Sequence, residues 1–270
     1  RRLAVHVKVD SGMGRLGLVP DGGRQVDSGK DARAGARETV AAIAGLKGLE
    51  LEGIYTHFAD ADSTDPTYTR RQQRVFCEFL DDLGGAGIHI PIRHAANSAA
   101  IIAHPETHLD LVRAGISIYG LRPSASITLQ GLELRPAMAL KARVVHVKRV
   151  PAGFAVSYGM TWSAPSPTVV ASVAVGYADG YSRRLSSRGT MLVRGRRAAV
   201  IGRVCMDTTM LDVGHIPGVA VGDEVVVFGR QGDDEIPADE LASTLETINY
   251  EIVTSITARV PRIYLPDDRS

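Results

Sequence analysis

Lysine is scarce in this chain of 270 residues. Only five residues are lysine, so arginine supplies most of the 31 basic side chains, which face 30 acidic ones. So small a net charge excludes strong electrostatic attraction to nucleic acid or to a membrane surface. We expect neither as a partner.

Cysteine is rarer still, and long apolar runs are missing. Cys77 and Cys205 lie in apolar contexts without C-x-x-C spacing, which predicts a reduced, cytoplasmic protein, and we expect no metal site. No apolar run approaches the ~20 residues of a membrane span, and no signal peptide is visible. The chain begins with Arg1, not methionine, and enters a strand almost at once. We therefore expect an internal start.

The first half alternates between extended and helical patterns. Apolar spacing predicts strands at residues 3–10 and 49–58, helices at 31–46 and 67–87, and strand-then-turn segments at 90–100 and 109–121. Strands separated by helices indicate parallel pairing with helical crossovers.

The texture changes near residue 132. Short strands joined by Gly, Pro and Asp turns are expected at residues 138–150, 168–180, 190–204, 208–213 and 223–229, with one helix at 236–248. The sequence thus predicts a partial (β/α) domain, residues 1–131, and a mostly antiparallel β domain, residues 132–270, joined near residues 122–136.

The stretch GMGRLG, residues 12–17, fits the letters of a dinucleotide-binding motif after a strand. That motif needs a helix to begin within the glycines, so that its N-terminus faces the pyrophosphate. Instead Pro20, Gly22 and Gly23 follow, and no acidic residue ends a second strand about 20 positions on. The context argues against dinucleotide binding and leaves Arg15 as the residue of interest.

Polar side chains recur at the ends of the expected parallel strands. They are Arg15, His57, the group His94, Asn97 and Ser98, and Arg113. Any one of them could be a satisfied core group or an edge cap. Four successive polar strand ends instead fit a (β/α) barrel, whose catalytic residues gather at that face. Because such a barrel has eight strands, we expect the missing ones before Arg1.

Eight blocks, in order along the whole chain, together resemble the alanine racemases, the pyridoxal-phosphate enzymes that interconvert L- and D-alanine. They read VHVKVDSGMGRLG, GIYTHFADAD, HAANSAA, VRAGISIYGLRPS, VSYGMTW, VAVGYADGYSR, GRVCMDTTMLDV and ETINYEIVTSITARVPRIY. The resemblance implies the C-terminal portion of a (β/α)8 TIM-type barrel followed by a mostly antiparallel β domain. It also implies a cytoplasmic homodimer that supplies D-alanine for peptidoglycan of the bacterial cell wall.

The family's Schiff-base lysine lies on an early barrel strand, in a motif upstream of every block here. It has no counterpart among Lys8, Lys30, Lys47, Lys141 and Lys148. Lys8 instead matches a family lysine that is carbamylated in some members. The resemblance therefore does not imply that these 270 residues alone can racemise alanine.

The resemblance assigns the cofactor, pyridoxal 5′-phosphate, and the residues around it. Tyr158 would be the second acid/base, reaching into the partner subunit, within a polar network formed by His57 and Arg113. Arg113 would also face the pyridine nitrogen, to which arginine can only donate. The phosphate would be held by Ser98, Gly115, Ile116 and Tyr250.

Two further groups concern the substrate. Arg15 and the partner chain's Met206 would bind the alanine carboxylate, a task that suits a two-pronged guanidinium. The channel by which substrate enters would be lined by Tyr177, Asp62, Arg183 and Arg203.

Three other functions stay open at this point. A same-fold decarboxylase fits poorly, because decarboxylation needs neither the tyrosine of VSYGM nor an unprotonated ring. A racemase of another small amino acid, such as serine, is harder to separate from an alanine racemase. A non-catalytic, truncated fragment is the third possibility.

Overall fold

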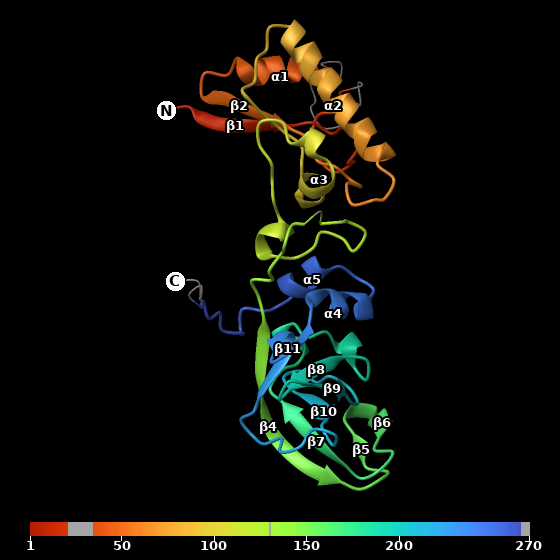
Figure 1. Cartoon of the computed structure of the whole chain (residues 1–270). Helices are drawn as coiled ribbons and strands as arrows, with labels where there is room; N and C mark the ends of the chain where they lie inside the picture. Colours follow the sequence, from red (N-terminus) through yellow and green to blue (C-terminus); the bar gives the residue numbers. More distant parts are fainter. Residues whose placement is uncertain (21–34, 130, 266–270) are drawn as a thin grey trace. The chain divides into compact units, whose positions relative to one another are not determined.

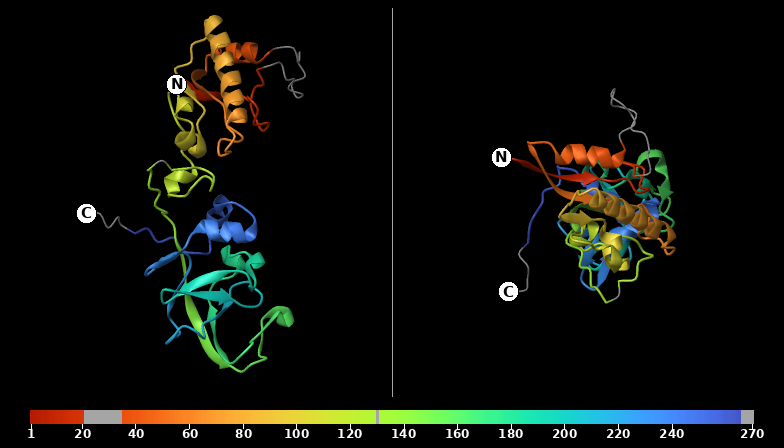
Figure 2. Two further views of the ribbon diagram at one scale, coloured as in Figure 1. Left: turned by 45° about the vertical axis from the view of Figure 1, so that its right-hand side comes forward. Right: turned by 90° about the horizontal axis from the view of Figure 1, so that it is seen from above.

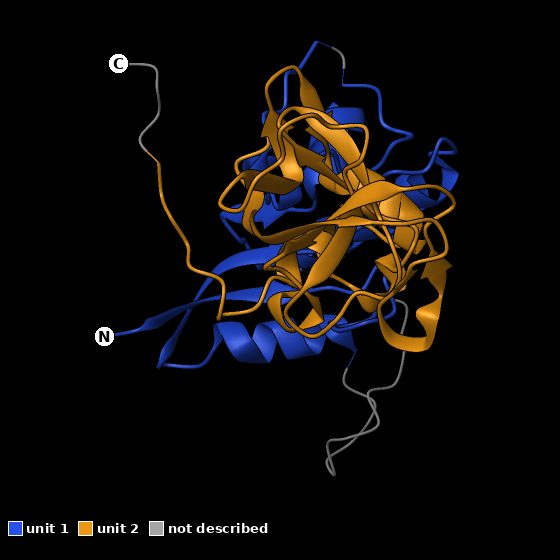
Figure 3. Cartoon of the chain, turned by 90° about the horizontal axis from the view of Figure 1, so that it is seen from below, with its two compact units in different colours: residues 1–135 blue, residues 136–270 orange. Residues whose placement is uncertain are grey.

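The computed structural model describes residues 1–20, 35–129 and 131–265. The chain divides into two compact units, residues 1–135 and 136–270 (Figure 3). The functional boundary expected between residues 131 and 132 stays a prediction. The helix expected at 31–46 begins outside the described residues, where Lys30 also lies.

The described part of the first unit is a parallel sheet with helical connections (Figure 1). Its strands are β1 (Leu3–Lys8), β2 (Leu49–Tyr55) and β3 (Ile92–His94), and its helices are α1 (Ala36–Ala44), α2 (Thr67–Gly85) and α3 (Ser98–Ala103). Strand order is β1-β2-β3, and both pairings are parallel. The alternating pattern predicted this arrangement correctly.

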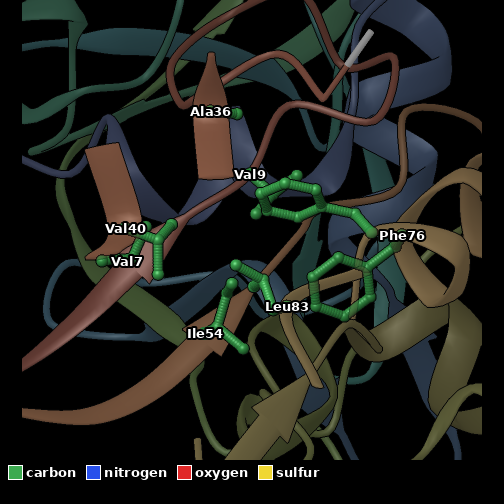
Figure 4. Packing of buried hydrophobic residues seen from close by; sticks show 8 residues of the cluster. Val7, Val9, Ala36, Val40, Ile54, Phe76 and Leu83 are labelled. Carbon is green, nitrogen blue, oxygen red and sulfur yellow. The ribbon is translucent and has the colours of Figure 1, made fainter. Parts of the chain in front are cut away.

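Helices α1 and α2 lie on one face of this sheet (Figures 1 and 2), and a single apolar cluster joins the layers. Figure 4 shows strand residues Val7, Val9 and Ile54 against Phe76 and Leu83 of α2. The buried positions of α2 recur at helical spacing, which gives the helix one apolar face. Burial of this face is what holds the helix over the strands and fixes the strand ends.

The fourth expected strand, within residues 109–121, is reduced to a single bridge between His94 and Leu111. On either side of this bridge the Asp110 amide donates to the Arg93 carbonyl and the Arg113 amide to the Ala96 carbonyl. A short 3-10 helix, Ile116–Tyr119, follows. The expected order of strand and then turn is present, but the strand is shorter than expected.

The second unit is a mostly antiparallel β domain, as predicted. Its strands are β4 (Leu140–Val150), β5 (Ala155–Val156), β6 (Trp162–Ser163), β7 (Thr168–Val173), β8 (Thr190–Val193), β9 (Arg196–Val200), β10 (Thr209–Asp212), β11 (Glu224–Gln231) and β12 (Asp234–Ile236). In residues 136–265 the order is β12-β11-β4-β7-β10-β9-β8, and β8 also pairs with β11. The sheet therefore closes on itself from β11 round to β8, so that β4, β7, β8, β9, β10 and β11 each pair with two strands of the ring, and of the described strands of this sheet β12 alone stays at an edge.

Two helices complete this unit, α4 (Ala238–Leu245) and α5 (Asn249–Thr254). Helix α4 packs against β11, whose residues 225–228 are all buried, as a strand covered on both faces must be. The sequence pattern predicted α4 and missed α5. In the described ranges, none of the helices has the length and apolar character needed to cross a bilayer.

Candidate functional site

The carboxyl ends of β1, β2 and β3 bring together polar side chains from three loops. The hydroxyls of Ser11 and Thr56, which follow β1 and β2, are 2.7 Å apart and buried. Gln72 of α2 is also fully buried, and its amide donates to the His57 carbonyl (3.1 Å) while its oxygen accepts the Ala59 N–H (2.8 Å). The loop that carries His57 is therefore fixed by the helix that covers the sheet.

Arg113 is the centre of this group. Its Nη1 donates to His94 Nδ1 at 2.6 Å, and its Nη2 lies within 3.1 Å of His57 Nδ1 and of the Thr56 and Ala95 carbonyls. The guanidinium carbon stands 5.0 Å from the centre of the Tyr55 ring. Among the described residues no carboxylate pairs with it. Its Nε–H and the second Nη1–H have no acceptor there either, so two donors of a fixed guanidinium are left for a ligand.

The bond from Arg113 sets the direction of a longer chain of hydrogen bonds. Arginine only donates, so His94 Nδ1 accepts and its Nε2 carries the proton, which is donated to His6 Nδ1 (2.7 Å). His6 Nε2–H then donates to the Glu52 carboxylate (3.0 Å). The chain of hydrogen bonds from Arg113 thus ends at a carboxylate, that of Glu52, two imidazoles away.

Gly53 makes room for this chain of hydrogen bonds. A Cβ at Gly53 would stand 2.3 Å from His6 Nδ1, closer than real contacts allow. The register between β1 and β2 shifts at Val5/His6, and His94 stacks on Tyr55 with ring centres 4.8 Å apart. The glycine and the neighbouring ring together hold the two imidazoles in line.

Both imidazoles that touch Arg113 are neutral at pH 7. Burial, and then the positive charge of Arg113, lower the pKa of His57 to about 4 and that of His94 to about 4. A neutral ring can accept from Arg113 and still donate from its other nitrogen. Of Arg113, His57 and His94, only Arg113 therefore carries a positive charge at pH 7.

A second polar group is formed by Ser98, Gly115 and Ser117. Buried Ser98, the first residue of α3, accepts at Oγ from the Gly115 amide (2.8 Å), the Ser117 amide (3.4 Å) and the Ser117 hydroxyl (3.1 Å). All three of these donors are thus occupied by Ser98 Oγ, and among the residues described the Ser98 hydroxyl has no acceptor of its own. The Ser98 O–H is the donor that remains for an oxyanion, such as the phosphate of a cofactor.

The glycine loop after β1 has its own acceptor. The Asp10 carboxylate accepts the amides of Gly12 and Gly14, each at 3.0 Å. Burial opposes ionisation of Asp10, but these amides and Lys8 outweigh it and lower its pKa. Because the loop amides are already occupied, they are not presented to a pyrophosphate.

Lys8 and Arg15 frame the same loop. Lys8 donates to the Leu16 carbonyl, and burial, partly offset by Asp10, lowers its pKa. Arg15 is exposed, and its charge, with that of Arg113, lowers the pKa of Lys8 further. Asp62 lies half-buried in the loop after β2, where its carbonyl accepts from Ser126.

In the second unit, three segments that carry expected site residues pack together. The Ser157 hydroxyl, next to Tyr158, donates to the Arg203 carbonyl (2.7 Å). The amides of Tyr177 and Ala178 donate to the carbonyls of Cys205 and Met206 (3.0 and 2.8 Å).

These contacts leave the expected side chains largely uncovered. Tyr158 is 72% exposed, Met206 56% and Tyr177 41%. Arg183 is joined to the group through Ser186, whose hydroxyl donates to the Arg183 carbonyl and accepts the Val204 amide. Tyr158, Tyr177, Arg183, Arg203 and Met206 thus belong to one surface of this unit.

The expected phosphate partners are divided between the units. Ser98, Gly115 and buried Ile116 belong to the first, whereas Tyr250 lies on α5 of the second. Their joint role stays a prediction. Sequence reasoning missed His6, Glu52 and Gly53, because only folding brings positions 6 and 94 into contact and no local pattern marks the pair.

Comparison with known proteins identifies the family. The family models described as "Alanine racemase, N-terminal domain" and "Alanine racemase, C-terminal domain" match residues 1–123 and 137–264. The alanine racemase of Desulforamulus reducens is 51% identical over 98% of this chain and 68% of its own length. The chain belongs to the alanine racemase family.

Other alanine racemases agree with this assignment. The enzyme of Desulfosudis oleivorans is 57% identical over 97% of the chain. The structure of alanine racemase from Bacillus anthracis with bound L-Ala-P matches with a TM-score of 0.88 at 39% identity, covering 99% of this chain and 66% of that one. The chain spans about two thirds of these relatives. The expected fold class, part of a (β/α)8 barrel followed by a mostly antiparallel β domain, is confirmed.

Proposed function

We propose that this chain carries much of the active site of an alanine racemase that uses pyridoxal 5′-phosphate to interconvert L- and D-alanine. The observation that carries the proposal is the Arg113 group. A guanidinium fixed by two neutral imidazoles and two carbonyls, with Nε–H and one Nη1–H left over, suits an acceptor such as a pyridine nitrogen.

The residues present fit the two polar ends of this cofactor. Arg113 would donate to the ring nitrogen without giving up its proton, and Ser98 and the amides of Gly115 and Ile116, with Tyr250, would hold the phosphate. When bound, the cofactor would accept electron density from Cα of the substrate. Because Arg113 leaves the ring nitrogen unprotonated, that acceptance is weaker, which limits side reactions.

Substrate would be held by its carboxylate. Arg15 offers a two-pronged donor, and the Met206 amide a single one. Tyr158 would take a proton from Cα, or return it, on one face of the substrate, with His57 and Arg113 as its polar neighbours. Tyr177, Asp62, Arg183 and Arg203 would line the approach.

Tyr158 and Met206 would serve the cofactor of a second copy, so the proposed working unit is a homodimer with shared sites. The product, D-alanine, points to a cytoplasmic role in supplying peptidoglycan. Whether these 270 residues racemise alanine unaided is the part of the proposal that activity measurements address.

Cofactor binding gives the direct test. Titration with pyridoxal 5′-phosphate, followed by its absorbance, should show saturable binding, and Ser98→Ala or Arg113→Gln should weaken it about 10-fold or more, the value of one charge-assisted hydrogen bond. The matched control is Arg93→Gln, which removes an arginine paired with Asp110 on β3. Binding insensitive to both site variants would refute the assignment.

Reaction products separate the alternatives. Chiral chromatography after incubation with L-alanine or L-serine reports racemisation of each, and released carbon dioxide reports decarboxylation. Borohydride treatment of the complex, followed by mass spectrometry, should show no cofactor fixed to any of the five lysines. A cofactor–lysine adduct would contradict the expectation drawn from their sequence contexts.

A further inference from the structure

Tyr158 lies in a tight hairpin of the second unit. Strands β5 and β6 pair as Val156 with Trp162, and the five residues between them form the loop. The loop is closed by a hydrogen bond from the Met160 amide to the Ser157 carbonyl (3.1 Å). In the described residues the phenol of Tyr158 has no hydrogen-bond partner, so its direction depends on the backbone that carries it.

That backbone is unusual at Ser157. Its φ of 68° and ψ of −177° fall in a region that essentially only glycine occupies. Gly159 (φ 70°) and Met160 (φ 50°) also have positive φ. A serine immediately before Tyr158 thus adopts a conformation that only its surroundings can enforce.

The surroundings are supplied by the turn at Gly202–Arg203. The Ser157 hydroxyl donates to the Arg203 carbonyl at 2.7 Å. A Cβ at Gly202 would stand 2.8 Å from Ser157 Cβ and 2.8 Å from the Val156 carbonyl. The two turns therefore pack backbone to backbone, with a hydroxyl joining them.

We propose that Ser157 is a positioning residue, whose hydroxyl bond to the Arg203 carbonyl holds the loop so that the Cα–Cβ bond of Tyr158 keeps one direction. The functional meaning of that direction rests on the role proposed for Tyr158. Glycine would fit the backbone angles without strain but would lack the hydroxyl that holds the loop. Serine adopts the strained backbone and supplies the hydrogen bond to the Arg203 carbonyl.

Local proteolysis measures how strongly this hydrogen bond opposes opening of the loop. Chymotrypsin cleaves after tyrosine, and cleavage of a folded loop follows the population of its open form when opening is fast. Ser157→Ala should raise cleavage at Tyr158–Gly159 about five-fold relative to cleavage at Tyr177–Ala178, the factor that one neutral hydrogen bond is worth. Mass spectrometry identifies the bond cut. Rates are divided by those of peptides 152–164 with the same change, which removes the protease's own preference.

Thr244→Val is the matched control. The Thr244 hydroxyl donates to the Glu240 carbonyl (2.9 Å) within α4, so it is a hydroxyl-to-carbonyl bond of the same kind that does not involve the Gly202–Arg203 turn. This variant should leave the Tyr158 cleavage ratio unchanged. If Ser157→Ala does not fold, as judged by Trp162 fluorescence, Ser157→Gly carries the test and should raise the ratio at least as much.

An unchanged ratio in the Ser157 variants, or an equal rise in Thr244→Val, would overturn the proposal. Neither cofactor nor substrate enters the assay. A failure here therefore leaves the racemase assignment standing, and a lack of cofactor binding leaves this result standing.

Discussion

The two units hold their functional side chains in opposite ways. In residues 1–135, Arg113 is fixed by its own side-chain bonds to imidazoles and carbonyls, and the histidines it touches are neutral. In residues 136–265, Tyr158 and Met206 are exposed and are carried on turns that are fixed through the backbone.

This difference matches the roles proposed for the two groups. A half-buried cation such as Arg113 must be oriented by its neighbours, which requires a side-chain network around it. In the proposed homodimer Tyr158 and Met206 would reach a second copy and would have to stay uncovered, so only the backbone beneath them can be held rigid. Disturbing side chains should therefore damage the first unit, and disturbing turns should damage the second.

The largest effect is expected from Gly176→Ala in the second unit. The new Cβ would stand 2.4 Å from the Cys205 carbonyl oxygen and 2.5 Å from the Met206 carbonyl carbon, and backbone atoms cannot rotate away. We expect a loss of about 3 kcal/mol in the free energy of unfolding. Urea titration followed by Trp162, the chain's single tryptophan, reports on this unit.

Gly53→Ala is the counterpart in the first unit. Its Cβ meets the ring of His6, which can swing aside at the cost of its bonds to His94 and Glu52, so we expect about 1–2 kcal/mol. Far-UV circular dichroism follows the helices of this unit. Gly48→Ala, with open space around it, should change stability by about 0.5 kcal/mol at most. A loss of stability in Gly53→Ala larger than that in Gly176→Ala would contradict the expected difference between the two units.

Acid should weaken the first unit through its neutral histidines. The folded pKa of His57 and of His94 is about 4, below the ordinary 6.5, so the unfolded chain binds more protons between these values. The free energy of unfolding should therefore fall as pH falls from about 6.5 to about 4. Urea midpoints across this range measure the slope. His94→Gln should flatten it, and His89→Gln, at an exposed position after α2, should not.

A smaller effect is expected from the ion pair beneath the Tyr177 turn. Asp179 accepts the Gly176 amide (2.8 Å) and pairs with Arg259 (2.9 Å), whose side chain is half exposed. Arg259→Gln should lower the unfolding free energy by about 1 kcal/mol. Lys141→Gln, which breaks the exposed pair with Glu224, should cost about 0.5 kcal/mol or less. Equal losses in the two variants would show that the Arg259–Asp179 pair contributes no more than an exposed ion pair.

The sequence predicted those parts of the fold that repeat a local pattern. Helix α2 shows an apolar stripe at helical spacing, and the strands of the second unit lie between Gly and Asp turns. The strand part of the strand-then-turn segment expected at residues 109–121 is reduced to a bridge at Leu111, because the apolar residues that follow form a 3-10 turn. Helix α5 was missed because INYEIV is rich in residues that also suit strands.

For the candidate site, the sequence identified residues but not how they are arranged in space. Arg113, His57 and Ser98 followed from strand ends and from the family resemblance, and the structure shows what each of them touches. The bond between His94 and His6 joins positions 88 apart, and the φ of Ser157 depends on a neighbouring turn. Neither feature is marked by a local sequence pattern, because both arise only when segments distant in the sequence come into contact.

The loop after β1 has a consequence of its own. The Asp10 carboxylate takes up, from within the chain, the amides of Gly12 and Gly14. Loss of that carboxylate would leave both amides without their acceptor, beside the charge of Lys8. The conformation of the glycine loop therefore depends on one acidic side chain.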